Sequence, residues 1–285
     1  MREQYCDLHT HSRYSDGTAE PAEIIELAEE IGLSAVALTD HNTVEGLPEF
    51  LAAAEGKRVR AIAGVEFSTL YGEIERELHI LALFVSPKHF DKVTALARKP
   101  HEDKERSNLE LLEALRGIGI NLDYEKMKAS TKGTVNRAHF AAEMVAQGYV
   151  KNNNEAFLGV LHPDRGYYRA PKRLDAFETI AFIKSIGAVA ILAHPLMHLN
   201  EKELNAFLEK ARNYGLDGIE TEYSEFSQVQ TEQAKCAAER FGLLQSGGSD
   251  FHGKNKKHIS LGTGVWGLQV PMSFAEALEK RAKEI

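Results

Sequence analysis

Short apolar runs alternate with amphipathic helical patterns along most of this chain. Seven runs have the length and apolar character of buried strands, at residues 5–8, 35–38, 61–67, 78–85, 188–193, 218–221 and 243–246. A turn near Tyr71 and Gly72 joins the third and fourth runs. Helical periodicity predicts helices at 21–31, 44–55, 174–186, 201–214, 228–241 and 274–283. Strands that alternate with helices in this way predict an α/β fold of barrel type.

A polar stretch, residues 89–173, interrupts the alternation. It contains a long helical pattern at 103–116, a shorter one at 137–147, and no convincing strand. We therefore expect a barrel domain formed by residues 1–88 and 174–285. We expect residues 89–173 to be a helical cap, inserted between strands four and five, that determines substrate specificity.

The composition narrows the classes of function. Of 285 residues, 43% are apolar and 27% are charged, as in ordinary globular proteins. No apolar run approaches the ~20 residues that cross a bilayer, and the first residues lead into a strand without a secretory signal. Cys6 and Cys236 make no disulfide framework, so we expect a cytoplasmic protein without a membrane partner. The net charge of −8 argues against an extended surface for duplex nucleic acid.

Histidines and acids gather where the predicted strands end. The segments concerned are 7–11 with 15–17, 39–41, 64–66, 193–195 and 247–252. In α/β barrels the carboxyl ends of the strands converge on one mouth, where catalytic residues normally lie. Six of the 12 histidines lie at or near such ends, and four of the six have an acid within two residues. We expect these distant residues to meet at one mouth.

The residue types at these ends are ligands for divalent metal ions. His9 and His11 lie two apart on an extended chain, so both side chains leave one face, and Asp250 and His252 repeat this spacing. The candidates exceed the need of one ion and suit two or three, and a mixed imidazole and carboxylate site accepts manganese, iron or zinc. The candidate ligands are His9, His11, Asp16, His41, Glu66, His79, His194, Asp250 and His252. The histidines interpreted as surface residues are His89, His101, His162, His198 and His258.

An ordered set of motifs makes a family recognisable. The chain resembles the PHP (polymerase and histidinol phosphatase) family at His9-Thr10-His11, Asp16, Thr39-Asp40-His41, Glu66, His194-Pro195 and Ser249-Asp250-Phe251-His252. The resemblance covers nearly the whole chain, with the cap only loosely matched. Within the family, the chain looks most like bacterial nucleoside 3',5'-bisphosphate phosphatases and related 5'-to-3' exoribonucleases. Their cap segment is similar to Asn136-Arg137-Ala138-His139-Phe140.

This resemblance implies a distorted seven-stranded barrel that holds three metal ions. The implied ligands are His9, His11, Glu66 and Asp250 for the first ion, Asp16, His41 and His252 for the second, and Glu66 with His79 and His194 for the third. Family members often carry an acid after the Thr-Asp-His motif, whereas this chain has Asn42. The resemblance therefore does not predict which residues surround His41.

The expected function is that of a metal-dependent phosphoesterase acting on phosphate monoesters of nucleotides. The substrate would be a nucleoside 3',5'-bisphosphate that loses its 3'-phosphate, or the 5' end of a short RNA. Clustered cations would lower the pKa of bound water from ~15.7 to about 7 and so make hydroxide available. Glu66 and His194 are candidate catalytic residues. Asp40 is a third candidate, which could either orient His41 or relay a proton to the leaving group.

Substrate selectivity is expected from cations of the cap. Arginine matches phosphate oxygens two at a time. Arg137 and His139 are favoured because they open a helix whose N-terminus attracts anions. The substrate-binding candidates are Arg106, Asn136, Arg137, His139 and Arg169, and the further cations are Lys132, Arg165, Lys172 and Arg173.

Three other functions stay open. Amidohydrolase-type deaminases also begin with His-x-His on a barrel strand, but this chain has Glu66 and no lysine at a predicted strand end. A histidinol phosphate phosphatase would need an acidic partner for the substrate amine, and Glu220 and Glu222 could provide it. A metal-stabilised binding module would keep the ligands without catalysis.

Overall fold

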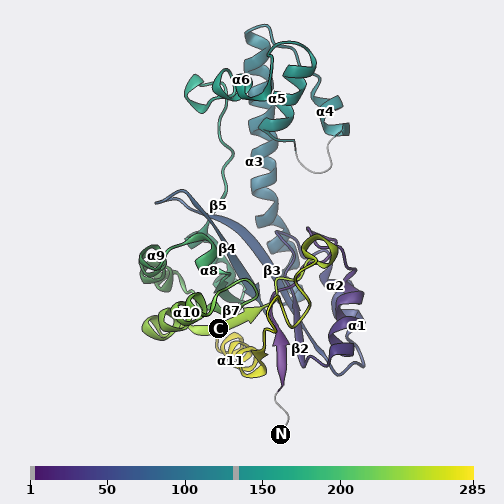
Figure 1. Ribbon diagram of the computed structural model, residues 1–285, viewed down its shortest axis with the longest axis vertical. Helices are drawn as coiled ribbons and strands as arrows, with labels where there is room; N and C mark the ends of the chain where they lie inside the picture. The colour runs from purple at the N-terminus through teal and green to yellow at the C-terminus, as the bar shows by residue number, and fades with distance from the viewer. Residues whose placement is uncertain (1–3, 131–134) are drawn as a thin grey trace. The chain divides into compact units, whose positions relative to one another are not determined.

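The computed structural model describes residues 4–130 and 135–285, and Lys132 therefore lies outside the described residues. The chain divides into two compact units, one made of Met1–Ala97 with Leu174–Ile285 and the other of Arg98–Arg173. Helix α3, Phe90–Gly117, is continuous across the first boundary (Figure 1). It begins earlier than the predicted helix at 103–116, and Pro100 lies inside it.

The first unit is built on one mixed sheet. Its strands follow the order β8-β7-β6-β4-β3-β2-β1-β9, and the short β5 pairs with β3. Neighbours are parallel except β4, which is antiparallel to β3 and β6, and β9, which is antiparallel to β1. The strands are β1 (Tyr5–Asp7), β2 (Ala35–Leu38), β3 (Arg60–Tyr71), β4 (Arg76–Leu83), β5 (Leu174–Asp175), β6 (Val189–Leu192), β7 (Gly218–Tyr223), β8 (Leu244–Gly248) and β9 (Val270–Pro271).

The sheet curls so that the end of β1 meets β8, which lies at the far end of the strand order. The amide of Leu8, just after β1, donates to the carbonyl of Gly247 in β8 at 3.1 Å. The amide of Asp250 donates in turn to the carbonyl of His9 at 2.9 Å. A side chain at Gly248 would collide with His9, so only glycine allows this approach. The predicted α/β barrel is thereby confirmed, with the two-residue strands β5 and β9 added to the seven expected runs.

Helices cover the sheet, and their caps follow from the sequence. Helix α1 ends at Gly32, whose φ of 80° is the left-handed conformation that glycine adopts without strain. Asn200 and Ser227 form capping boxes at the starts of α9 and α10. The helices of this unit are α1 (Pro21–Ile31), α2 (Leu47–Ala53), α7 (Ala176–Ser185), α8 (Pro195–His198), α9 (Glu201–Tyr214), α10 (Gln228–Phe241) and α11 (Met272–Glu284), with 3-10 turns η1 (Pro87–His89) and η3 (Gly253–Lys256).

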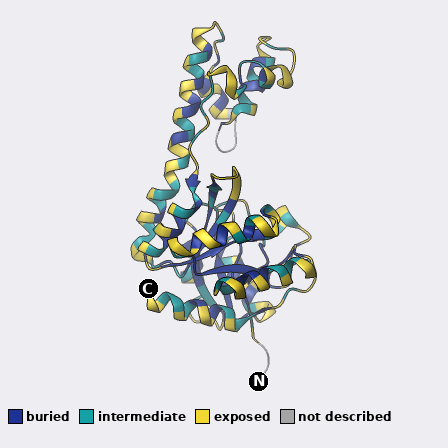
Figure 2. Ribbon diagram, turned by 90° about the vertical axis from the view of Figure 1, so that its left-hand side faces the viewer, coloured by how far each residue is buried: buried dark blue, intermediate teal, exposed yellow. Residues whose placement is uncertain are grey.

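Alternate side chains of the strands enter two apolar clusters. In β2, Val36 and Leu38 belong to a cluster with α1, α2 and α7, whereas Ala35 and Ala37 belong to a cluster with α11. This is the period of two that a strand imposes on its side chains. Figure 2 shows the strands buried, while the helices expose one face.

Two of the predicted helices begin later in the structure than the sequence indicated. Helix α2 begins at Leu47 rather than residue 44, because the residues before it form a turn. The helix predicted at 174–186 begins at Ala176, because Leu174 and Asp175 pair with β3 and the Asp175 side chain caps the helix. The predicted turn near Tyr71 is confirmed as the connection of the β3–β4 hairpin.

The second unit has a helical core of its own. Leu111, Leu115, Phe140 and Met144 are fully buried within it. Its elements besides the C-terminal part of α3 are α4 (Tyr124–Ser130), α5 (Arg137–Ala146), α6 (Asn153–Leu158) and the 3-10 turn η2 (Pro163–Arg165). The sequence did not predict α4 and α6, which are too short to show a clear periodicity. Across both units, no helix in the described part of the chain is long and apolar enough to cross a membrane.

Candidate active site

The barrel brings all of the predicted metal ligands together. His9 and His11 follow β1, His41 follows β2, and Glu66 and His79 lie within the β3–β4 hairpin. The remaining ligands follow β6 and β8 or lie on the loop after β1. Their ligand atoms form four groups, in each of which all atoms lie within 4.8 Å of one another. The groups are His11, Asp16, His41 and His252; His9, His11 and Asp250; His9, Glu66 and His194; and His41, Glu66 and His79.

Glu66 lies at the centre of this cluster and is 1% exposed. Its carboxylate is surrounded by five imidazoles from four segments of the chain. The nitrogens within 2.9–3.3 Å of its two oxygens belong to His9, His11, His41, His79 and His194. Such a carboxylate could bridge two cations, because its two oxygens face different imidazoles.

The tautomer of His9 directs a lone pair into the cluster. Its Nδ1 lies 2.9 Å from Glu220 Oε1, so Nδ1 carries the proton. The Nε2 lone pair then faces His11 Nε2 at 3.0 Å, and Asp250 Oδ1 lies 3.5 Å and 3.1 Å from these two nitrogens. With both rings deprotonated, three electron-rich atoms would approach one another in this buried space, an arrangement that a divalent cation stabilises.

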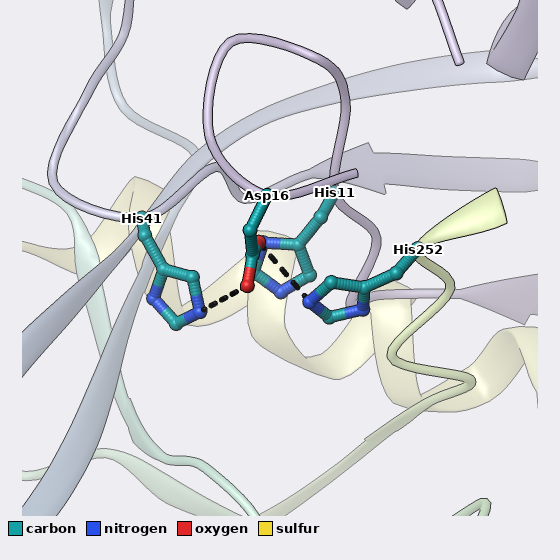
Figure 3. Close-up of side chains that lie close together, drawn as sticks. All are labelled: His11, Asp16, His41 and His252. Atoms are coloured by element: carbon teal, nitrogen blue, oxygen red, sulfur yellow. Dashed lines mark ion pairs between the residues drawn. The ribbon is translucent and has the colours of Figure 1, made fainter. Parts of the chain in front are cut away.

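A second group lies beside the first and includes the exposed Asp16. His252 Nδ1 donates to the carbonyl of Asp250 at 2.8 Å, which leaves Nε2 to face Asp16 Oδ1 at 3.1 Å. Asp16 Oδ2 lies 3.8 Å from His41 Nε2, so the carboxylate stands between the two rings (Figure 3). Burial and the charges of His11 and His79 hold the pKa of His41 at about 4 despite the opposing effect of Glu66, so its ring offers lone pairs at neutral pH.

Several buried polar atoms in the cluster have no hydrogen-bond partner. They include Glu66 Oε2, His41 Nδ1 and His194 Nδ1. A buried polar atom without a partner costs about 1–3 kcal/mol. Metal coordination would supply partners for Glu66 and His41, so the residues present fit divalent metal ions.

We expect metal binding to release protons at neutral pH. Burial lowers the pKa of His11 and His79, but carboxylates more than offset it: Asp250 and Glu66 raise the pKa of His11 to about 9, and Glu66 with Glu77 raises that of His79 to about 10. In the metal-free protein both rings are therefore positively charged at pH 7, with a proton on each nitrogen, and a cation must displace one of these protons to bind. The affinity for Mn²⁺ should rise with pH until about 9–10.

Calorimetric titration of Mn²⁺ in two buffers of different ionisation enthalpy measures the protons released. Equal apparent enthalpies in the two buffers, with an affinity that does not change as the pH rises, would contradict the prediction.

Comparison with known proteins agrees with this geometry. Residues 7–168, more than half of the chain, match the PHP domain family. The chain belongs to the PHP family. It is 32% identical over 275 residues to a 5'-3' exoribonuclease of Haemophilus influenzae, covering 93% of this chain and 99% of that protein. It is 30% identical to the 3',5'-nucleoside bisphosphate phosphatase of Chromobacterium violaceum, covering 86% of each chain.

A solved structure gives the same result for the fold. A Bifidobacterium adolescentis protein, provisionally assigned as a metal-dependent phosphoesterase, superimposes with a TM-score of 0.67 at 27% identity, covering 98% of this chain and 96% of that one. This PHP protein is accordingly a metal-dependent phosphoesterase, an enzyme that hydrolyses ester bonds.

Two buried carboxylates hold the candidate metal ligands of this PHP protein in place, and the sequence did not reveal either role. Asp7 accepts hydrogen bonds from the amide and hydroxyl of Ser249, at 2.9 Å and 2.6 Å, and from the amide of Gly262 at 2.8 Å. Glu220 accepts from His9 Nδ1 and, at 2.6 Å, from the amide of His194, whose φ is +27°. An acid inside a short apolar strand was the available signal for both.

We expect Glu220→Gln to weaken metal binding about 10- to 100-fold, as loss of such an orienting partner typically does. Glutamine keeps only one acceptor oxygen, so it cannot hold both the His9 ring and the His194 amide. Metal content after dialysis against a weak chelator measures the effect. Glu222→Gln is the matched control, because this acid of the same strand pairs with Lys235 at 2.8 Å. Equal metal retention by the two variants would contradict the assigned role of Glu220.

Asp40 holds the loop that carries Asp16. It accepts from the amide and hydroxyl of Ser12 at 2.7 Å and 2.6 Å, and from the hydroxyl of Ser15 at 2.6 Å. The described hydrogen bonds of the Asp40 side chain thus go to this loop and not to the His41 ring. Asn42, at the position where family members often carry an acid, exchanges hydrogen bonds with Ser68.

One histidine lies elsewhere than the sequence indicated. His198 was interpreted as a surface residue, but it is partly buried, with its ring centroid 5.4 Å from that of His194 and 5.8 Å from that of His79. It lines a cavity of about 260 Å³ together with Asp16, Glu66 and Tyr223. The helix α8 is only four residues long, so the end of β6 and His198 stay close together.

The candidate substrate-binding residues all lie in the second unit. Asn136 caps α5, and its amide donates to His139 Nδ1 at 3.1 Å. Arg137 stacks on Tyr168, 4.3 Å from the ring centroid. Asn136 and Arg137 line a cavity of about 530 Å³ within this unit.

The other two candidates have acidic partners. Arg169 pairs with Asp103 at 2.9 Å and with Glu110 at 2.7 Å. Arg106 also pairs with Asp103. Their charges are therefore partly neutralised inside the unit, whereas the described polar contact of the Arg137 side chain is a carbonyl, that of Leu161.

Proposed function

We propose that this PHP enzyme removes terminal phosphates from nucleotides, with nucleoside 3',5'-bisphosphates or the 5' ends of short RNAs as substrates. The observation that carries the proposal is the convergence of nine imidazoles and carboxylates on one buried cluster. The names of the two similar relatives, an exoribonuclease and a nucleoside bisphosphate phosphatase, support nucleotides as the substrate class.

We assign two or three divalent ions, of manganese, iron or zinc, to the cluster. Bound there, they would neutralise the phosphoryl oxygens and lower the pKa of a coordinated water. The proposed ligand sets are His9, His11, Glu66 and Asp250 for one ion, Asp16, His41 and His252 for a second, and Glu66, His79 and His194 for a third. Two of the groups of close ligand atoms support the first and second sets, whereas His79 and His194, proposed together for the third, belong to separate groups that share Glu66.

The other residues of the site hold these ligands in position. Glu220 and the carbonyl of Asp250 fix the tautomers of His9 and His252. Ser249 lies beside a proposed ligand, but its hydroxyl donates to Asp7, which suits a structural role rather than that of a nucleophile. The contacts of Asp40 likewise favour a positioning role over proton transfer.

Assays of phosphate release with Mn²⁺ test the proposal. The substrates are a nucleoside 3',5'-bisphosphate, a short 5'-phosphorylated RNA, histidinol phosphate and a simple aryl phosphate. We expect turnover of the first two to exceed that of the others, and to be lost in a His9→Ala/His11→Ala double variant. Full metal content without hydrolysis of any nucleotide would refute the proposal.

Histidinol phosphate is disfavoured as the substrate by the surroundings of the two acids that could bind its amine. Glu220 is fully buried, and both of its oxygens accept hydrogen bonds from the protein. Glu222 pairs with Lys235.

We expect Arg137→Ala to raise KM for bisphosphates about 10-fold or more, the usual effect of losing a charged hydrogen bond, and to change KM for the aryl phosphate much less. The reason is that a guanidinium suits a second phosphate, which the aryl ester lacks. Arg165→Ala is the control, since Arg165 is exposed on η2. Equal changes for both substrates would remove Arg137 from substrate recognition.

A further inference from the structure

Asp250 divides its two oxygens between the interior and the mouth of the site. Oδ1 faces His9 and His11, whereas Oδ2 accepts from the Tyr223 hydroxyl at 2.9 Å and lies 2.6 Å from Lys256 Nζ. Lys256 is thus separated from the metal cluster by a single carboxylate. The positive charge of Lys256 therefore attracts an anion that binds next to Asp250.

Lys256 can bind more than Asp250 alone. Its ammonium group has three protons, and Asp250 is its one described side-chain partner. The side chain is 32% exposed and lines the cavity of about 260 Å³ that leads to the cluster. Donors that Asp250 does not use therefore face the space that a substrate would enter.

The cavity is lined by several acids, so a cation there favours the binding of an anionic substrate. Its lining includes four acids: Asp16, Glu66, Glu225 and Asp250. Among the described residues that line it, Lys256 is the only lysine or arginine. A phosphate dianion that approaches the metals meets these four carboxylates beside the imidazoles of the site, so one ammonium group at the mouth changes the local field.

The backbone beneath Lys256 is fixed. Residues of η3 are attached to the loop after β1, because the amide of Lys254 donates to the Thr18 hydroxyl at 2.8 Å and Asn255 Nδ2 donates to the carbonyl of Asp16 at 2.7 Å. Gly253 packs directly on Thr18 with a φ of 60°, which glycine permits. Lys256 is therefore held near the cluster by the same loops that carry Asp16 and His252.

We propose that Lys256 binds a non-bridging oxygen of the substrate phosphate, and so determines affinity for phosphate at the metal centre. This proposal rests on the proposed function, since it concerns the same cavity. One N–H group of the Lys256 ammonium keeps its contact with Asp250, and another donates a hydrogen bond to the phosphate oxygen. It thereby joins the metal-bound carboxylate to the bound anion.

Inorganic phosphate is the probe, titrated calorimetrically into the Mn²⁺-loaded enzyme, with each variant at a manganese concentration that saturates its own site. We expect Lys256→Gln to raise the Kd of phosphate about 10- to 100-fold, in line with the loss of a charged hydrogen bond. Lys256→Arg should stay within about threefold of the wild type, because it keeps the charge. Lys257→Gln, at the exposed neighbouring position, should have no effect.

An unchanged Kd in Lys256→Gln overturns the proposal, and so does an equal change in Lys256→Gln and Lys257→Gln. A purely structural role would lower metal content or thermal stability instead, and both are measured on the same samples. Failure of the proposed function is a separate result, since it would appear as absent nucleotide hydrolysis in the wild type. Phosphate binding tests Lys256 in either case.

Discussion

Glu66→Gln is expected to lower kcat/KM for nucleotide hydrolysis by about 1,000-fold or more, as loss of electrostatic stabilisation at a preorganised site does. The carboxylate contacts five imidazoles and is nearly inaccessible to water. Nearby histidine charges hold its pKa well below its usual value although burial acts in the opposite direction, so it is ionised at neutral pH. An amide of the same shape removes this charge and leaves one oxygen where two are needed.

Steady-state kinetics and metal analysis of the purified variant measure the effect. Glu73→Gln is the matched control, because Glu73 lies in the turn of the same hairpin and pairs with Lys210 on the surface. Activity of Glu66→Gln within about tenfold of the wild type would show that the central carboxylate is not needed for catalysis.

Asp7→Ala is expected to reduce the free energy of unfolding by about 3 kcal/mol. The Asp7 carboxylate is fully buried and accepts hydrogen bonds from Ser249, Gly262 and the amide of His9. Alanine would leave these donors without partners and open a cavity beside β8. Urea unfolding of the metal-free protein measures the change without interference from the cation.

Two further variants delimit the role of Asp7. Asp7→Asn keeps one acceptor oxygen and should lose less stability than Asp7→Ala. Glu26→Ala, on the exposed face of α1, should change stability by no more than about 0.5 kcal/mol. A loss in Asp7→Ala as small as that of Glu26→Ala would contradict the proposed anchoring of the 249–262 segment.

The sequence predicted that the candidate ligands would meet at one mouth, because their positions follow from one rule. Strand ends in an α/β barrel share a mouth, and apolar periodicity locates strand ends closely enough to place His9, His41, His194 and Asp250 there. The same rule says nothing about which atoms face each other. The tautomer of His9, for example, depends on Glu220, which belongs to a strand 211 residues away in sequence.

The helical segment between the barrel strands was harder to predict from the sequence, for two physical reasons. Helix α3 contains Pro100 within a polar stretch, residues 98–107, so the sequence pattern does not show that its turns from Phe90 continue into the predicted helix at 103–116. Ion pairs such as Arg169 with Asp103 join residues 66 apart in sequence. Propensity and periodicity describe neighbours within a few turns, and cannot distinguish a cation that faces an acid from one that faces a substrate.

The insertion of the helical unit into the barrel has a consequence for the order in which the enzyme matures. Three of the four ligand groups take a member from beyond residue 173, namely His194, Asp250 or His252. A chain still being synthesised, with residues 1–173 already out of the ribosome, therefore has most of its imidazoles but no closed cluster to trap a cation. We therefore expect full metal loading only after β8 has been synthesised and the Leu8 amide has paired with the Gly247 carbonyl.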